Sequence, residues 1–517
     1  MNGTLALLRL ALRLDRVRLP IWLAALTLSA AGSASSFASV YPTDADRAGL
    51  LAAANANPTF AALYGQAHGA GIGALTSWRL ITFYGVIAGL MTVLLVIRHT
   101  RTDEDAGRLE LLRATVVGRH AALTAALLEA LLANTALALL VGLTMPAPHP
   151  GGLALGAAFA GTGLTAGAVA AVAAQLTESP RAATGIAGAY LGAAYGTRAV
   201  ADAAGIDWLR WVSPIGWAQQ IRPYAGDRWW ILALFAALFA LLAAAAWTLA
   251  ARRDVGAGLL AARPGRAEGR LTGPFALAWR LQRGTLIAWL AGFATAGLGI
   301  GAAAGSVADF VDGPDSTAGQ LVARLGGTGG IVDAYLATSL GLCAMVAGLY
   351  TVTAVLRLRG EETALRAEPV LATGVTRRAW MATHLTIAFA GTAALLLVLG
   401  TGAGLVHGGL PRILAASAAL IPAAWVVGGI AAALFGLLPR AATAAWAAVG
   451  AFLLIAFLGP ILKAPGWVQD LSPYTHTPHL PGPAPTGGLA TPLTWLTVIA
   501  AALTTAGLIG LRRRDIG

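Results

Sequence analysis

Apolar stretches of about 20 residues recur along the whole of this 517-residue chain, and they constrain its fold more than any other feature. Each stretch is long enough to cross a bilayer as a helix. In lipid every backbone polar group needs an internal partner, so only helices or closed barrels can cross. A barrel would show short alternating strands rather than long apolar runs. Only 11% of the residues are charged, against about 25% in a soluble protein. The sequence therefore predicts an all-α polytopic membrane protein.

The apolar stretches divide evenly between the two halves of the chain. Six predicted spans lie at 20–40, 78–98, 121–144, 153–176, 183–203 and 229–250. Six more lie at 286–305, 334–356, 381–406, 413–436, 441–462 and 493–511. The outer segments 41–77 and 306–333 are too long for simple turns. The outer segments 204–228 and 463–492 contain Trp residues, which suits either short interfacial helices or polar loops.

The basic residues predict the orientation of these twelve spans. With the N-terminus inside, the cytoplasmic segments hold 26 of the 35 basic residues, which is the positive-inside bias. Both termini are then cytoplasmic. The high pI reflects orientation next to anionic lipid and not binding to nucleic acid. The expected location is a bacterial plasma membrane.

The two halves of the chain repeat one another at an offset of about 258 residues. The segment "PRAAT" occurs at 180–184 and 439–443, and the endings "RRDVG" at 252–256 and "RRDIG" at 513–517 correspond. Arg13, Arg16 and Trp22 match Arg280, Arg283 and Trp289. Six spans in each half give both the same orientation, so the halves are expected to be parallel repeats. The predicted domains are 1–256 and 273–517, joined by a cytoplasmic linker at 257–272.

A charged segment follows the second span of each half, at 100–120 and 359–379. The acids at Asp103, Glu104 and Asp105 suit the start of a helix, and Arg108 and Arg113 suit its later turns. Leu109 and Leu112 make this predicted helix amphipathic. An anchor to lipid headgroups is one interpretation. Repetition at the same place, with acids as well as bases, favours contact with another protein.

The acidic start, the "LELLRAT" run and the closing Arg119 resemble the cytosolic coupling segment of type V, ABCG-like, ABC-transporter permeases. The fused twelve-span form resembles actinobacterial exporters of polyketide antibiotics. The resemblance implies that two copies of a separate ATPase subunit contact these segments. The implied contact residues are Glu104, Arg108, Glu110, Arg119, Glu362, Arg366, Glu368 and Arg377. Val116 and Gly374 stand where the family often has Pro, and Pro369 replaces the Leu111 of the first copy.

The chain itself is not expected to hydrolyse ATP. A Walker A loop needs a Lys after Gly, but the single lysine, Lys463, follows Leu462. ATP and Mg²⁺ are therefore expected on the partner subunit, and no cofactor is expected here. No nucleophile–base arrangement indicates an enzyme. The one cysteine, Cys343, and the scattered histidines indicate no metal site.

Several residues within the spans are candidates for a substrate route. Glu129 is a carboxylate in the third span, where it is either functional or protonated and bonded to a neighbouring helix. The large aromatic and thioether candidates are Tyr84, Met91, Tyr190, Tyr195, Tyr350 and Trp446. The resemblance implies export of hydrophobic or amphipathic compounds such as antibiotics. The alternative is an ion-coupled twelve-span secondary transporter, for which Glu129 is the main support. A lipid-modifying enzyme is a further alternative without a catalytic constellation.

Overall fold

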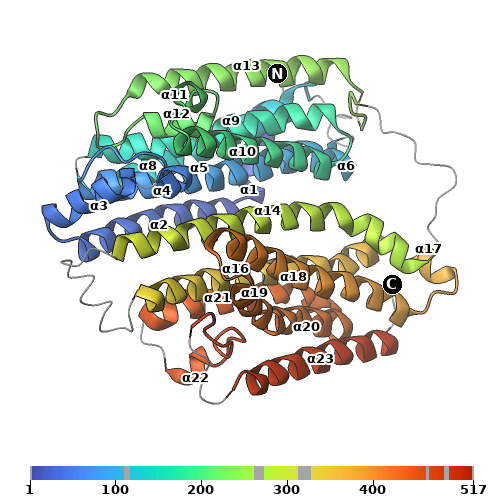
Figure 1. Ribbon diagram of the computed structural model, residues 1–517. Coiled ribbons are helices and arrows are strands. Elements are labelled where there is room, and N and C mark those ends of the chain that lie inside the picture. Colours follow the sequence, from blue (N-terminus) through green and yellow to red (C-terminus); the bar gives the residue numbers. More distant parts are fainter. Residues whose placement is uncertain are drawn as a thin grey trace. The chain divides into compact units, whose positions relative to one another are not determined.

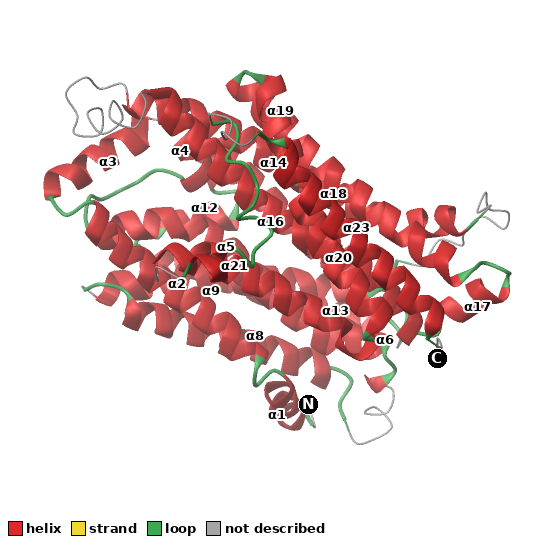
Figure 2. Cartoon of the chain, turned by 90° about the horizontal axis from the view of Figure 1, so that it is seen from below, coloured by secondary structure: helices red, strands yellow, loops and turns green. Residues whose placement is uncertain are grey.

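The computed structural model describes residues 3–514, except 57, 110–116, 148, 255, 261–272, 312–327, 462–464 and 483–487. All regular structure in this described part is helical (Figures 1 and 2). The chain divides into two compact units, unit 1 at Met1–Gly265 and unit 2 at Arg266–Gly517. The boundary falls within the predicted linker, most of which lies outside the described residues.

Unit 1 is a bundle built around one central apolar helix. Its helices are α1 (Thr4–Leu14), α2 (Arg18–Val40), α3 (Asp44–Ala56), α4 (Pro58–Tyr64), α5 (Ile72–Ile97), η1 (Arg98–Thr102), α6 (Asp103–Asp105), α8 (Ala121–Thr144), α9 (His149–Leu176), α10 (Pro180–Ala203), α11 (Asp207–Arg210), α12 (Pro214–Gln220), η2 (Trp229–Ile231) and α13 (Leu232–Arg252). Helix α9 packs against α5, α8, α10, α12 and α13. Its small residues, such as Gly156 and Ala158, let neighbouring backbones approach closely.

Unit 2 is a second bundle, in which α18 and α20 carry most of the packing. Its helices are α14 (Pro274–Val311), α16 (Thr328–Thr363), α17 (Ala367–Ala372), α18 (Arg377–His407), α19 (Leu410–Ala419), α20 (Ile421–Leu437), η3 (Pro439–Ala444), α21 (Ala445–Ile461), α22 (Gly466–Gln469) and α23 (Ala490–Arg513). Gly297 and Gly301 of α14 touch the backbone of α18, and Gly436 of α20 touches Gly507 of α23. A β-carbon at these glycines would collide with backbone oxygens.

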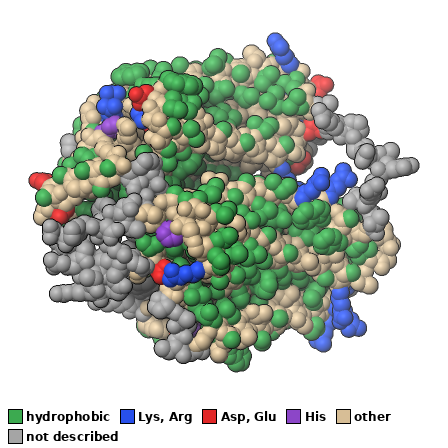
Figure 3. Space-filling view, in the orientation of Figure 1, with side chains coloured by type: hydrophobic (Ala, Val, Ile, Leu, Met, Phe, Trp, Pro, Cys, Tyr) green, Lys and Arg blue, Asp and Glu red, His purple; other side chains and the backbone are tan. Residues whose placement is uncertain are grey.

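Ten helical segments of the described residues are long and apolar enough to span a bilayer. They correspond to ten of the twelve predicted spans. In Figure 3 hydrophobic side chains cover a large share of the described surface of unit 2, and several blue basic side chains lie at the right-hand end, where Figure 1 labels α17. This is the surface expected of a multi-pass membrane protein.

The other two predicted spans form different elements. The segment 183–203 is the 24-residue helix α10, which contains the buried ion pair of Arg198 and Asp202 at 3.3 Å and is less apolar than the ten. The segment 441–462 consists of η3 and the short apolar helix α21. Short helices occur in the Trp-containing outer segments, as one of the two interpretations predicted. Those helices are α11, α12 and α22. Most of 306–333 lies outside the described residues.

Candidate functional site

The predicted coupling segment of unit 1 begins as a direct continuation of α5. The helix runs on through the π-helical turn η1 and the single turn α6, and it stops before Gly107. Gly107 has a φ of 70°, a left-handed conformation that favours glycine. The amphipathic helix predicted across 100–120 is therefore interrupted at this residue. Glu110 and Leu112 lie outside the described residues.

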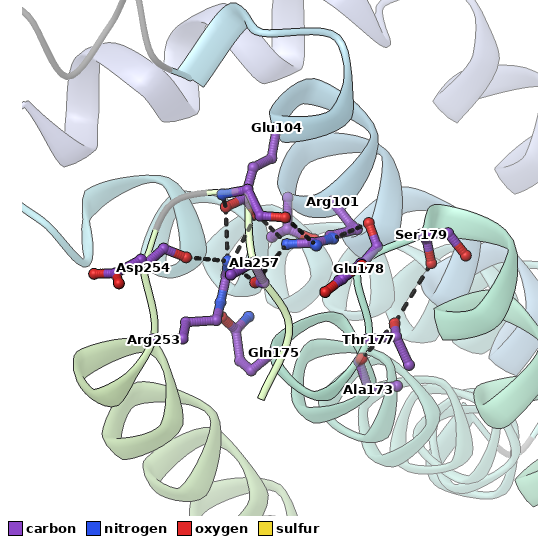
Figure 4. Close-up of polar contacts among 12 residues, drawn as sticks. Arg101, Glu104, Ala173, Gln175, Thr177, Glu178, Ser179, Arg253, Asp254 and Ala257 are labelled. Carbon is purple, nitrogen blue, oxygen red and sulfur yellow. Dashed lines mark hydrogen bonds and ion pairs between the residues drawn. The ribbon is translucent and has the colours of Figure 1, made fainter. Parts of the chain in front are cut away.

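Glu104 does not present its carboxylate to solvent. Its side chain is only 2% exposed, and it forms an ion pair with Arg253, which follows α13 (Figure 4). The two guanidinium nitrogens of Arg253 donate to Oε1 and Oε2 at 2.6 and 2.7 Å. The Arg101 guanidinium also donates to Oε2, and the Gly256 backbone N–H donates to Oε1 at 2.8 Å. A carboxylate this buried is stable only with several such partners.

Arg101 and Arg119 complete this arrangement. Arg101, 1% exposed, donates to the carbonyl oxygens of Glu178, Gly256 and Ala257. Arg119 donates to the carbonyl oxygen of Arg253 at 3.0 Å. The α5 extension, the turn before α10 and the segment after α13 are thus tied together (Figure 4). We call the contact between Glu104 and Arg253 the unit 1 clasp.

Unit 2 holds its own charged segment by an equivalent contact, the unit 2 clasp. Both guanidinium nitrogens of Arg514 donate to the carboxylate of Glu362 at 2.8 Å, and Arg377 donates to the carbonyl oxygen of Arg514. The Arg514 guanidinium also lies 4.9 Å from the ring centre of Phe435. Arg253 and Arg514 hold the same position in the endings "RRDVG" and "RRDIG". Sequence reasoning noticed the repeated ending but did not assign these two arginines to the site.

The remaining predicted contact residues are more exposed. Arg108 pairs with Asp103 at 2.8 Å and is 66% exposed. Arg366 pairs with Glu361 rather than with Glu362, and it is 56% exposed. Glu368 lies exposed on α17. Arg108, Arg366 and Glu368 are accessible to a partner, whereas Glu104 and Glu362 are engaged within their own units.

Gly374 explains one departure from the family pattern. It follows α17 with a φ of 84°, a value that the ring of proline cannot adopt. Thr376 then caps α18 by accepting a hydrogen bond from the Ala379 N–H. The sequence at this place therefore builds a left-handed turn before the next span. Val116 lies outside the described residues.

Glu129 belongs to a buried polar cluster in unit 1. The side chain is fully buried, and its Oε2 lies 3.4 Å from Nε2 of His99. The same nitrogen lies 2.6 Å from Oδ2 of Asp15, whose other oxygen is 2.9 Å from Arg98. The cluster joins the end of α1, the start of η1 and α8. Asp15, His99 and Glu129 each offer an atom within 4.8 Å of the others, so they could hold a cation.

The predicted route residues do not gather in one place. Tyr84 stacks on Phe159 at 5.7 Å, and Tyr195 lies 4.8 Å from the Arg198 guanidinium. Tyr190 is half-buried in α10. Tyr350 is buried in unit 2, and Trp446 is 42% exposed. Met91 lines a cavity of about 320 Å³ in unit 1.

The described residues contain ten apolar helices, and a charged segment follows the second predicted span of each unit. These features define a multi-pass α-helical membrane protein. Residues 271–512 match the family model described as the C-terminal domain of the multidrug efflux system permease Rv1217c. The chain is also 43% identical over 529 residues to the multidrug efflux system permease protein Rv1217c of Mycobacterium tuberculosis. That similarity covers 100% of this chain and 95% of the relative. The chain belongs to this family of multidrug efflux permeases.

Proposed function

We propose that this chain is the membrane subunit of an ATP-driven exporter of hydrophobic or amphipathic compounds. The relative is named a permease of a multidrug efflux system, and a permease subunit is expected to move compounds outward. The proposed form is a type V permease with twelve spans in two parallel repeats. It lies in the plasma membrane with both termini in the cytoplasm. Helices α10 and η3–α21 would supply the fifth and eleventh spans.

Energy would come from two copies of a separate P-loop ATPase subunit, docked at 100–120 and 359–379. The chain has no Gly-Lys pair for a Walker A loop, since Lys463 follows Leu462. ATP and Mg²⁺ would therefore bind to the partner. The exposed residues Arg108, Arg366 and Glu368 are proposed direct contacts.

The observation that carries this proposal is the clasp, which occurs in both units. A segment that served only as a lipid anchor would not need its acid fixed by two hydrogen bonds to the last helix of the same unit. In our proposal the clasp makes the segment rigid, so that a push from the ATPase moves α5 and α13 together. Glu104, Glu362, Arg253 and Arg514 are then positioning residues rather than contacts.

The buried cluster of Asp15, His99 and Glu129 favours a second candidate, an ion-coupled secondary transporter. Intramembrane ionisable groups are the usual sites of such coupling. This candidate does not account for the two clasped segments. It predicts transport that follows an ion gradient and continues without any ATPase.

The test uses the full chain, purified with P-loop subunits from the same cell. We expect one such subunit to bind in a ratio of two to one chain and to hydrolyse ATP faster when bound. Replacing both Glu110 and Glu368 with Arg should weaken binding, whereas replacing the exposed Arg181 outside these segments should not. Transport without a bound ATPase would reject the proposal, and so would full coupling in the doubly reversed protein.

A further inference from the structure

The cavity beside Met91 has features of a binding site for a small molecule. It lies within unit 1, between the end of α1, the first turns of α2 and the last turns of α5. Its volume of about 320 Å³ falls within the range of sites that hold small ligands. Its lining includes three charged residues, Asp15, Arg18 and Arg98, which stand at the end of α1, the start of α2 and the start of η1. Trp22, Met91 and Leu94 are among the apolar residues of the remainder.

The charged part offers donors rather than acceptors. Both oxygens of Asp15 are engaged, by Arg98 at 2.9 Å and by His99 at 2.6 Å, and its side chain is 6% exposed. Arg98 is 28% exposed and has this one ion pair, whereas a guanidinium carries five N–H donors. Arg18 is exposed, and no ion pair joins it to another residue in the described part of the chain. An anionic group can therefore bind here without displacing an existing contact, whereas a cationic group cannot.

The apolar part can hold a hydrophobic body next to that anionic group. Trp22 is half-buried, and its ring presents a broad apolar face. Met91 is 2% exposed, and its flexible thioether adapts to different shapes. Leu94 is 43% exposed, so it is accessible from outside the helix bundle.

We propose that this cavity binds an anionic amphiphile. Its carboxylate, sulfate or phosphate would contact Arg18 and Arg98, and its apolar part would lie against Trp22, Met91 and Leu94. The same chemistry occurs in a soluble acidic compound and in an anionic lipid. Binding itself does not depend on the proposed export function, but the identification of the ligand as an exported substrate does.

Unit 2 lacks the groups that this proposal needs. In the part of the repeat that aligns Arg13 with Arg280, Gln282 stands at the position of Asp15. At the offset of 258 residues, Leu356 stands at the position of Arg98 and Leu349 at that of Met91. Gln282 is buried and hydrogen-bonded to His384 at 3.0 Å. The proposed site is therefore specific to unit 1, and unit 2 suggests the substitution Arg98→Leu as a test.

The experiment measures binding of a dansyl-labelled undecanoic acid to the full chain in phosphatidylcholine nanodiscs, without ATP or a partner subunit. The methyl ester of the same compound is the uncharged control. We expect saturable binding of the acid and about tenfold weaker binding of the ester, since a charge-assisted hydrogen bond contributes at least 1.5 kcal/mol. Arg18→Leu and Arg98→Leu should each weaken the acid about tenfold. Trp22→Ala should weaken both compounds.

Arg13→Leu is the matched control, because Arg13 is exposed on α1 and does not line the cavity. It should bind the acid as the unaltered chain does. If Arg98→Leu fails to fold, Arg18→Leu decides the test, since Arg18 is exposed. Equal affinity for acid and ester, or unchanged affinity in both Arg variants, would overturn the proposal.

Adding phosphatidylglycerol to the nanodiscs separates the two sources of anion. A loss of affinity for the acid that is larger in the unaltered chain than in Arg18→Leu would show that a lipid headgroup occupies the cavity, since the negative surface potential alone weakens both equally. An equal loss in both proteins, or none, would show a site for soluble amphiphiles. The proposed function is tested separately. Absent binding together with ATP-dependent export would reject this cavity site alone. Saturable binding of the acid, together with a failure of every candidate P-loop subunit to associate with the chain, would leave the site intact and reject the proposed function.

Discussion

Units 1 and 2 hold their charged segments in the same way, yet they differ in the chemistry behind them. In each unit an arginine after the last helix binds a glutamate after the second predicted span. Unit 1 also buries Asp15, His99 and Glu129, while unit 2 has the hydrogen-bonded pair of Gln282 and His384. The units share the contact that we propose transmits motion from a partner ATPase. They differ in the buried carboxylates, which unit 1 carries at this place and the matching positions of unit 2 do not.

The largest expected effect comes from breaking the clasps one at a time. Arg253→Ala removes the main partner of Glu104, whose side chain is 2% exposed, and should lower the free energy of unfolding by about 3 kcal/mol. Arg514→Ala should cost less, about 2 kcal/mol, because Glu362 is 11% and Arg514 16% exposed and water can partly solvate the carboxylate that is left. Unfolding in detergent, followed by circular dichroism, measures both.

Arg252→Ala, at the exposed neighbour of Arg253, is the control for this pair and should have little effect. The exchange of charges in E104R/R253E should recover part of the loss. Equal losses in Arg253→Ala and Arg514→Ala would show that the two clasps do not differ in burial as the structure indicates.

A second test exchanges Glu129 of unit 1 with Ile387, the residue at the matching position of unit 2. Ile387→Glu introduces into unit 2 the acid that unit 1 carries, and should cost about 2.5 kcal/mol in the middle of an apolar helix. Glu129→Ile should instead stabilise unit 1 by about 1 kcal/mol, since neither carboxylate oxygen accepts a hydrogen bond and its one ion contact, to His99, is long at 3.4 Å. The same unfolding measurement applies.

The transport activity of the Glu129→Ile variant, measured beside its stability, shows whether the acid has a function. If stability rises while transport falls, then Glu129 has a functional role. If both are unchanged or improved, the acid has none. A loss of stability would mean that Glu129 has a partner that compensates its burial.

A third test compares how closely the helices pack. A β-carbon on Gly436 would lie 2.0 Å from the backbone oxygen of Gly507, whereas one on Gly161 would meet the ring of Phe235 at 2.7 Å. A ring can rotate away but the backbone cannot, so Gly436→Ala should cost about 2 kcal/mol and Gly161→Ala less. Gly450→Ala, with no atom within 4 Å, is the control. A larger loss in Gly161→Ala than in Gly436→Ala would contradict this ranking.

The smallest effect is expected at the exposed charges of the proposed coupling segments. Arg108→Ala and Arg366→Ala should each change the free energy of unfolding by no more than about 0.5 kcal/mol, because exposed ion pairs contribute little. Their effect should appear in the complex, as weaker stimulation of the ATPase. Unchanged stimulation in both variants would remove them from the proposed contact surface.

The sequence predicted the helical fold and most of the spans because a 20-residue apolar run has few alternatives in lipid. It also located the two charged segments. It did not show that Glu104 and Glu362 are engaged within their units, since their partners lie 149 and 152 residues away along the chain. Periodicity reports local structure and contains no information about pairing at that range. The repeated endings "RRDVG" and "RRDIG", each at the end of one half of the chain, are the sequence signal that could have drawn attention to Arg253 and Arg514.

Nor could the sequence separate one route residue from another. Tyr84, Tyr190 and Met91 all have side chains suited to an apolar cavity. Of these three, Met91 of α5 lines the cavity between α1, α2 and α5. That outcome depends on the angle at which α2 meets α5, and composition does not determine this angle.

The distance along the chain between the clasp partners has a consequence for biosynthesis. Arg253 is translated 149 residues after Glu104, which at about 5–20 residues per second is a delay of roughly 7–30 s. During that time the carboxylate must remain hydrated, so the start of the charged segment cannot yet be packed as in the finished molecule. Closure of the clasp therefore marks the moment at which the last helix of unit 1 has been inserted. A chain that stalls before α13 would display an open segment that membrane quality control could recognise.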